Sequence, residues 1–183
     1  MRSIDYKMIL IIFGIVLGFV ILGVFRTQVA RNGAINLEEQ IATAYSNIDV
    51  QQKRRADLIP NLVDCVKDYN EHEYETLIGI INARNMRNDA QVNEVQMLVA
   101  AVAEAYPELK SNSNYKELMN ELSITENLIA NYRNNYNFQV RAYKNYVRKF
   151  PNNVFINLSG YEVKAYDYLK FDADVNAPTN LFN

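Results

Sequence analysis

The chain has 183 residues, which is room for one domain or for one domain with an appendage. Its formal net charge is −2 and its longest basic run is residues 53–55, so the composition argues against a surface that neutralises nucleic-acid phosphates. The single cysteine, Cys65, excludes an internal disulfide.

The first predicted element is a membrane anchor over residues 8–25. This stretch has no ionisable side chain, and as a helix it is about 27 Å long, close to the ~30 Å hydrocarbon core of a bilayer. The alternative is a cleaved signal peptide, whose apolar part is shorter and is followed by small residues that are missing here. The sequence favours a retained anchor, which includes Met8, Ile12, Gly14, Gly18, Ile21 and Phe25.

Two features of the anchor leave alternatives open. Gly14 and Gly18 have the spacing that lets two membrane helices approach closely, but glycine is common in membrane helices in any case. The positive-inside rule gives almost a tie, with a lean towards a cytoplasmic soluble part. The cations that enter this count are Arg2 and Lys7 before the segment, and Arg26 and Arg31 after it.

From residue 30 onward the apolar pattern predicts helix almost throughout. The first helical face continues to Arg55. Asp57 is then expected to cap either a new helix or a kinked continuation, with Pro60 in the first turn.

A polar turn is predicted over residues 85–89 and a third helix over residues 92–105. Tyr106-Pro107 should end that helix, because proline disfavours the helical conformation in the residue before it. Residues 111–113 then cap the longest helix.

The longest helix has the clearest pattern in the chain. Its apolar and tyrosine residues step alternately by three and four over about 36 residues, with one stutter, and Phe150-Pro151 stops it. A seam this narrow needs partner helices, either in the same chain as an antiparallel bundle or in a second copy. The seam consists of Tyr115, Leu118, Leu122, Thr125, Ile129, Tyr132, Tyr136, Val140, Tyr143, Val147 and Phe150.

Residues 152–183 have a different composition: a short apolar stretch, a break at Gly160, a tyrosine-rich segment through Tyr168 and a tail. The predicted fold is all-α, an N-terminal transmembrane helix followed by an antiparallel long-helix bundle with coiled-coil-like packing. The expected segments are a short N-terminal tail (1–7), the transmembrane helix (8–25), the bundle (26–151) and a C-terminal segment (152–183).

Residues 44–73, AYSNIDVQQKRRADLIPNLVDCVKDYNEHE, closely resemble the signature block of the LemA family of bacterial membrane proteins. Further matches follow in order at residues 105–110 (AYPELK), 121–127, 136–137 and 150–151, so the likeness covers roughly residues 30–170. The resemblance implies a helical bundle on one N-terminal helix in the inner (plasma) membrane of a bacterium.

The resemblance implies no chemistry, because the family has no agreed biochemical activity. One branch serves magnetosome membranes, and genes for an HtpX-type membrane metallopeptidase often lie nearby. After Phe150-Pro151 the chain departs from the usual Gly-Phe-Lys-Pro-like ending and has residues 160–163 (GYEV) instead. A role for the C-terminal segment is therefore not carried over.

The residues that most often carry chemistry are isolated in this sequence. His72 is the single histidine, and it is more readily a solvated helix residue than a zinc ligand, since zinc needs three or four ligands. Cys65 has no base spaced to activate it and is interpreted as a small buried hydrophobic residue. We expect no catalytic residue, no metal and no cofactor.

One charged group has both a structural and a functional interpretation. Asp49 and Lys53 are four residues apart and can pair on a helix, and Arg55 could reach Glu126 on a neighbouring helix. The group fixes helix register, or it contacts a second subunit or anionic lipid. Its members are Asp49, Lys53, Arg54, Arg55, Asp57 and Glu126.

The anchor, the long seam and the lack of a catalytic constellation together predict a non-enzymatic protein. The predicted function is a membrane-anchored helical scaffold that self-assembles into homo-oligomers and organises or shapes the membrane. Its expected partners are membrane lipid and further copies of itself, and not nucleic acid. The alternative is a monomeric adaptor or modulator of a membrane metallopeptidase of the HtpX type.

Overall fold

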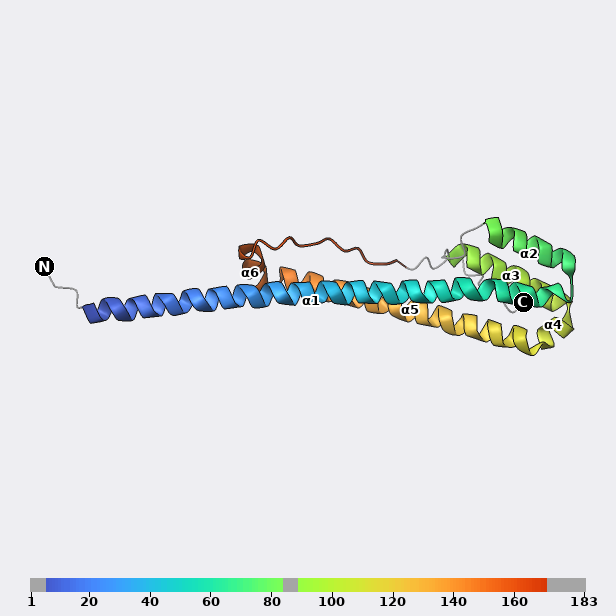
Figure 1. Cartoon of the computed structure of the whole chain (residues 1–183), viewed down its shortest axis with the longest axis horizontal. Helices are drawn as coiled ribbons and strands as arrows, with labels where there is room; N and C mark the ends of the chain where they lie inside the picture. Colours follow the sequence, from blue (N-terminus) through green and yellow to red (C-terminus); the bar gives the residue numbers. More distant parts are fainter. Residues whose placement is uncertain (1–5, 84–88, 171–183) are drawn as a thin grey trace, which may run out of the picture. The chain divides into compact units, whose positions relative to one another are not determined.

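The computed structural model describes residues 6–83 and 89–170, and these residues contain helices and no strand (Figure 1). They form two compact units: unit 1 combines residues 6–42 with 136–170, and unit 2 consists of residues 43–83 and 89–135. Two long helices contribute to both units. The helices are α1 (Tyr6–Lys67), α2 (Glu71–Ala83), α3 (Asp89–Ala105), α4 (Pro107–Ser111), α5 (Ser113–Arg148) and α6 (Asn152–Leu158).

Helix α1 is one uninterrupted helix of 62 residues with Pro60 in its interior. Of the two expectations at Asp57, the new helix with Pro60 in its first turn is therefore wrong; the helix continues through Asp57, and the kink expected there stays a prediction. Proline inside a helix removes one backbone hydrogen bond and costs about 3 kcal/mol. The residues around it offset that cost, because Ile59, Leu62 and Val63 are fully buried and a buried aliphatic side chain contributes about 1.5–3 kcal/mol.

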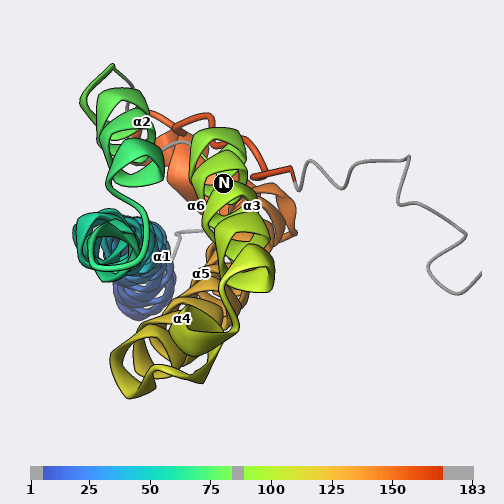
Figure 2. The ribbon, with the colours of Figure 1, turned by 90° about the vertical axis from the view of Figure 1, so that its right-hand side faces the viewer.

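Unit 2 is a bundle in which side chains of α1, α2, α3, α4 and α5 share one core. Figure 2 shows these helices viewed end on. The predicted third helix is confirmed as α3, which ends at Ala105, and Pro107 begins α4, where its missing N–H costs nothing. Of the predicted turn at residues 85–89, residues 85–88 lie outside the described residues and Asp89 begins α3. The core is formed by side chains such as Ile59, Val66, Leu77, Val95, Val99, Leu109 and Leu122.

The start of α5 is capped as its sequence predicts. The Asn112 side-chain oxygen accepts hydrogen bonds from the backbone N–H groups of Asn114 and Tyr115, at 2.8 and 3.2 Å. The seam is buried within the chain itself along most of α5. Phe150 is the exception: it lies beyond the helix end and is 78% exposed.

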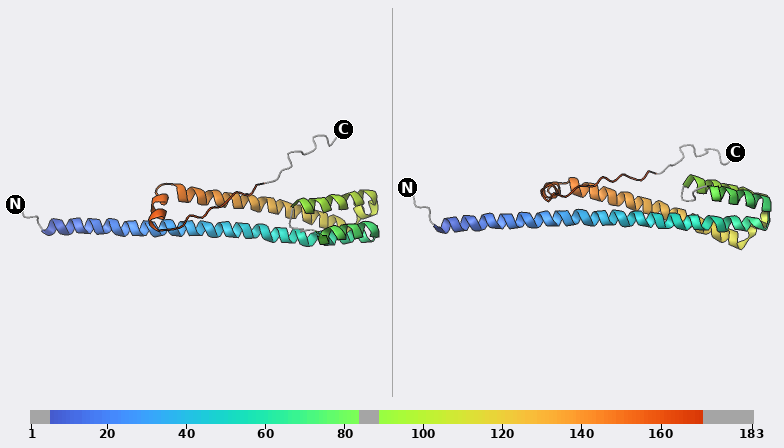
Figure 3. Two further views of the ribbon diagram at one scale, coloured as in Figure 1. Left: turned by 90° about the horizontal axis from the view of Figure 1, so that it is seen from above. Right: turned by 45° about the horizontal axis from the view of Figure 1, so that its top comes forward.

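In unit 1, the C-terminal part of α5 packs antiparallel to α1 (Figure 3). The Tyr146 hydroxyl lies 3.5 Å from the Val29 carbonyl oxygen, and the Tyr143 hydroxyl lies 3.2 Å from Glu38, so contacts move backward along α5 as they move forward along α1. Gly33 makes this approach possible, because a Cβ atom there would collide with the Tyr146 side chain.

After α6 the chain turns at Gly160, whose φ of +66° lies in the left-handed region that favours glycine. Residues 161–170 then run as an extended segment, here called the strap, back along unit 1. The predicted break at Gly160 is confirmed. The predicted tail lies largely beyond residue 170 and so outside the described residues.

The predicted all-α fold, with a long apolar N-terminal helix and an antiparallel helical bundle, is confirmed. The division into segments 1–7, 8–25, 26–151 and 152–183 stays a prediction, because the bounds of the two compact units do not show where the membrane begins or ends.

Candidate functional site

The anchor segment is the N-terminal part of α1. It is long and apolar enough to cross a bilayer, and none of its side chains is buried in the chain. Within the described residues, nothing approaches the positions where Gly14 or Gly18 would carry a Cβ atom, so the helix face that they share is open to lipid or to another helix. The predicted anchor residues Met8, Ile12, Ile21 and Phe25 are all exposed.

A buried carboxylate lies at the centre of unit 1. Glu38 falls on the face of α1 that packs against α5, and only 8% of it is exposed. Lys164 Nζ donates to Glu38 Oε2 at 2.7 Å, and the hydroxyls of Tyr161 and Tyr143 donate to Glu38 Oε1. The Tyr143 hydroxyl in turn accepts the backbone N–H of Lys164 at 3.0 Å. Glu38, Tyr143, Tyr161 and Lys164 are called the Glu38 cluster below.

The cluster shifts the acidity of its members. Burial by itself raises the pKa of Glu38, but hydrogen bonds from Lys164, Tyr161 and Tyr143 outweigh burial and leave that pKa below its ordinary value of 4.5. Burial and the hydrogen bond to Glu38 raise the pKa of Tyr161. The hydrogen bond to Glu38 also raises the pKa of Lys164. The favoured state is thus an ionised carboxylate, a neutral tyrosine and a cationic lysine.

Further contacts hold the strap along α5. The Asn137 side chain forms two hydrogen bonds with the backbone of Leu169, at 2.8 and 2.9 Å. The Tyr166 ring meets the Tyr143 ring edge to face, with centroids 5.3 Å apart. The Glu38 cluster therefore joins α1, α5 and the strap.

Glu38 was not predicted from the sequence to be a site residue. A signal was present: Ala30, Ala34, Ile41 and Ala44 are all buried on α1, and Glu38 continues their spacing of three and four. A carboxylate at such a position has to find partners when it is buried. Its partners are 105 to 126 residues away in the chain, which is why a local pattern could not name them.

The predicted charged group lies in unit 2, and its members are not all brought together. Arg54 forms an ion pair with Glu121 on α5, a partner that the sequence did not suggest. Arg55 is buried, whereas Asp49, Lys53 and Asp57 are exposed along one side of α1.

The remaining member of the charged group has an unexpected partner. Glu126 on α5 accepts a hydrogen bond from Gln96 on α3, at 3.0 Å. Whether the group binds a subunit or lipid stays a prediction.

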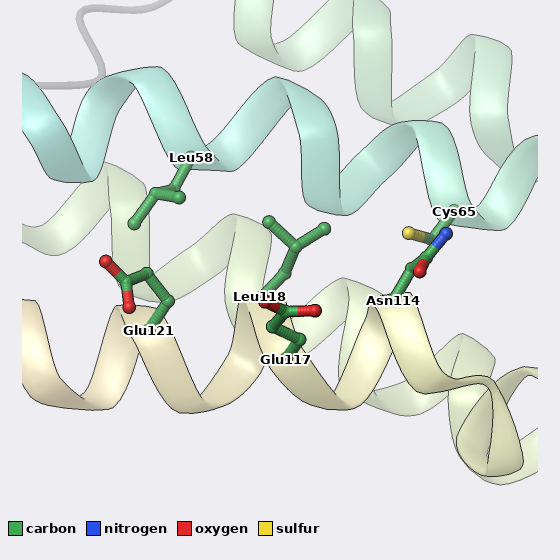
Figure 4. A pocket seen from close by; sticks show the side chains of 6 residues that line it. All are labelled: Leu58, Cys65, Asn114, Glu117, Leu118 and Glu121. Atoms are coloured by element: carbon green, nitrogen blue, oxygen red, sulfur yellow. The ribbon is translucent and has the colours of Figure 1, made fainter.

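A groove of about 400 Å³ lies between α1 and α5 in unit 2 (Figure 4). Leu58 on α1 lies opposite Glu121 on α5 at one end of the groove, and Cys65 lies beside Asn114 at the other end. Burial, together with Asp64 and Asp68, raises the pKa of the Cys65 thiol, which disfavours the thiolate that a nucleophile needs. The groove therefore gives its cysteine no activation.

Among residues 6–83 and 89–170, no group of three or more His, Cys, Asp or Glu side chains could hold a metal ion. His72 is exposed on α2.

Comparison with known proteins identifies one family. The sequence model of the LemA family matches residues 44–181. Among curated proteins, Protein LemA of Metamycoplasma hominis is 25% identical over 135 residues, which cover 67% of this chain and 62% of that protein. The chain thus spans less than two thirds of the length of this curated relative.

Proposed function

Since the chain belongs to the LemA family, we propose that it is a membrane-anchored, non-enzymatic helical scaffold that self-assembles at a bacterial membrane and organises or shapes the bilayer. One observation carries the anchored part of this proposal. Helix α1 runs without a break from an apolar segment that is exposed on all sides into a part that is packed against other helices. A helix of this kind holds a folded bundle at the bilayer.

The proposal places the contact between copies on unit 2. The heptad seam does not supply that contact, because its residues Leu122, Ile129 and Val140 are buried inside the chain. The exposed residues Asp49, Lys53 and Asp57 form a ridge of alternating charge on α1, at a spacing of four. A ridge of alternating charge is self-complementary, as a contact between identical copies requires.

The first test is the mass of the full-length protein in mild detergent, measured by light scattering. The scaffold predicts a discrete multiple of the 21.1 kDa chain mass. A particle of one chain would overturn self-assembly and favour the alternative, a monomeric adaptor or modulator of a membrane metallopeptidase.

The second test uses matched charge reversals. We expect Lys53→Glu to shift the particle towards a single chain, because it places like charges along the ridge. Lys116→Glu changes the net charge by the same amount at an exposed position of α5 in the same unit, and it should leave the mass unchanged. Equal masses for both variants would remove the ridge from the contact.

A further inference from the structure

Three exposed apolar side chains lie in the turn from α5 into α6 and along α6 itself. Phe150 precedes α6 and is 78% exposed, and Val154 and Leu158 are 44% and 71% exposed. Val154 and Leu158 are four residues apart on α6 and share a face, while Ile156, on the opposite face, is fully buried. Helix α6 therefore buries Ile156 on one face and exposes Val154 and Leu158 on the other.

The position of α6 along α1 is set by the contacts of unit 1. The Tyr146 side chain contacts Val29 and lies over Gly33, so the last turn of α5 reaches the level of residues 29–33 of α1. Phe25, the last residue of the anchor segment, is about 6 Å below Val29 at the rise of an α-helix. Both views place α6 beside α1 at this end of α5 (Figures 1 and 3). In the anchored arrangement proposed above, helix α6 would lie at the depth of the lipid headgroups.

The charge of this end of unit 1 has one sign. Residues 26–37 and 141–160 contain six cationic side chains and no acidic one. Arg26 and Arg31 on α1 and Arg148 and Lys149 at the end of α5 are all exposed. Cationic side chains close to a bilayer surface are attracted to anionic lipid headgroups.

We propose that the turn from α5 into α6 is a second membrane contact, in which Phe150, Val154 and Leu158 enter the headgroup region of an anionic bilayer. The surrounding cations hold this contact to anionic lipid. An exposed apolar face flanked by cations is the composition of segments that lie in the interface of a membrane. This inference rests on the anchored arrangement proposed above, and it deepens it by fixing unit 1 at two points on the bilayer.

The test measures depth with a fluorescent label on the full-length chain in lipid nanodiscs. In a Cys65→Ala background, Leu158→Cys carries the environment-sensitive fluorophore NBD, and lipids with a spin label near the headgroup quench it. Phe138→Cys is the matched control, since Phe138 is also an exposed apolar residue of unit 1 but lies further along α5 from this end. Ile12→Cys reports on the anchor itself.

We expect strong quenching at position 158 in phosphatidylglycerol nanodiscs, weaker quenching in phosphatidylcholine nanodiscs, and little at position 138 in either. Equal and weak quenching at positions 158 and 138, with deep insertion at position 12, would overturn the second contact and leave the anchor intact. Equal quenching at position 158 in both lipids would overturn the preference for anionic lipid. No insertion at position 12 would overturn the anchored arrangement itself.

Discussion

Lys164 and Glu38 are 126 residues apart in the chain, yet the Lys164 ammonium group donates a 2.7 Å hydrogen bond to the Glu38 carboxylate. This pair joins the strap to α1, and the Tyr143 hydroxyl on α5 completes the connection. The described part of the C-terminal segment, residues 152–170, is therefore part of the fold of unit 1, and the match to the family model extends over it.

Replacement of Glu38 by alanine should destabilise unit 1. The hydroxyls of Tyr143 and Tyr161 would lose a charged acceptor, and loss of a hydrogen bond to a charged group costs about 1.5–3 kcal/mol. Thermal unfolding in detergent, followed by circular dichroism, measures the change. Glu162→Ala removes an exposed carboxylate from the strap and should change the free energy of unfolding by less than about 0.5 kcal/mol. Equal effects of the two substitutions would contradict a role for the Glu38 cluster.

The stability that the cluster contributes should depend on pH at both extremes. Because the folded-state pKa of Glu38 is lowered, its contribution is present above 4.5 and is lost as the pH falls through the folded value. Because the folded-state pKa of Lys164 is raised, its contribution is present below 10.5 and is lost as the pH rises through the folded value. The difference in melting temperature between the wild type and Glu38→Gln isolates the acidic limb. A difference that stays constant from about pH 7 to about pH 3 would be evidence against this linkage.

Gly33→Ala should loosen the packing of α5 on α1. The added methyl group meets the Tyr146 side chain, and overpacking of this kind costs about 1–3 kcal/mol. Gly79→Ala is the matched control, because open space surrounds its Cβ position on α2, and it should be neutral or stabilising by up to about 1 kcal/mol.

A second substitution separates this collision from the general effect of an added methyl group. Tyr146→Ala should rescue part of the loss in the double variant, so that the two changes are not additive in thermal unfolding. Strict additivity would argue against the contact.

Cys65 should react slowly with Ellman's reagent in the folded protein. Burial, Asp64 and Asp68 raise its pKa, so the thiolate fraction at neutral pH is smaller than that of an ordinary thiol. The reaction rate of the folded chain should rise further with pH than that of the chain unfolded in urea. Identical pH profiles for the folded and unfolded chains would contradict an elevated pKa.

Much of the fold could be predicted because its causes are local. The seam on α5 is a periodic pattern, and its members Leu122, Thr125, Ile129 and Val140 are buried as that pattern requires. Phe150 continued the pattern in the sequence, but the helix ends at Arg148, so periodicity alone placed an exposed residue in the core. Pro60 shows the opposite case, in which the packing of its neighbours overrides a local signal to restart the helix.

The candidate sites were less predictable because they depend on contacts between distant segments. Arg54 was singled out, but its partner Glu121 lies 67 residues away, and the sequence offered several carboxylates of equal merit. Leu158 is exposed because α6 packs through Ile156 on its other face. The sequence of this seven-residue helix alone does not indicate which of its faces is packed.

Helix α1 is unbroken between the anchor and Ala30, the first buried position. The number of residues between them therefore determines how the packed face of α1 is oriented relative to the anchor. Each residue of an α-helix turns the chain by about 100° and raises it by about 1.5 Å. One residue inserted after Arg26 would rotate the packed face of α1 by that angle relative to Gly14 and Gly18. Four inserted residues would nearly restore the orientation but move the packed part of α1 about 6 Å further from the anchor. If anchors of neighbouring copies meet through these glycines, a single insertion redirects each bundle around its neighbour without altering any contact inside it.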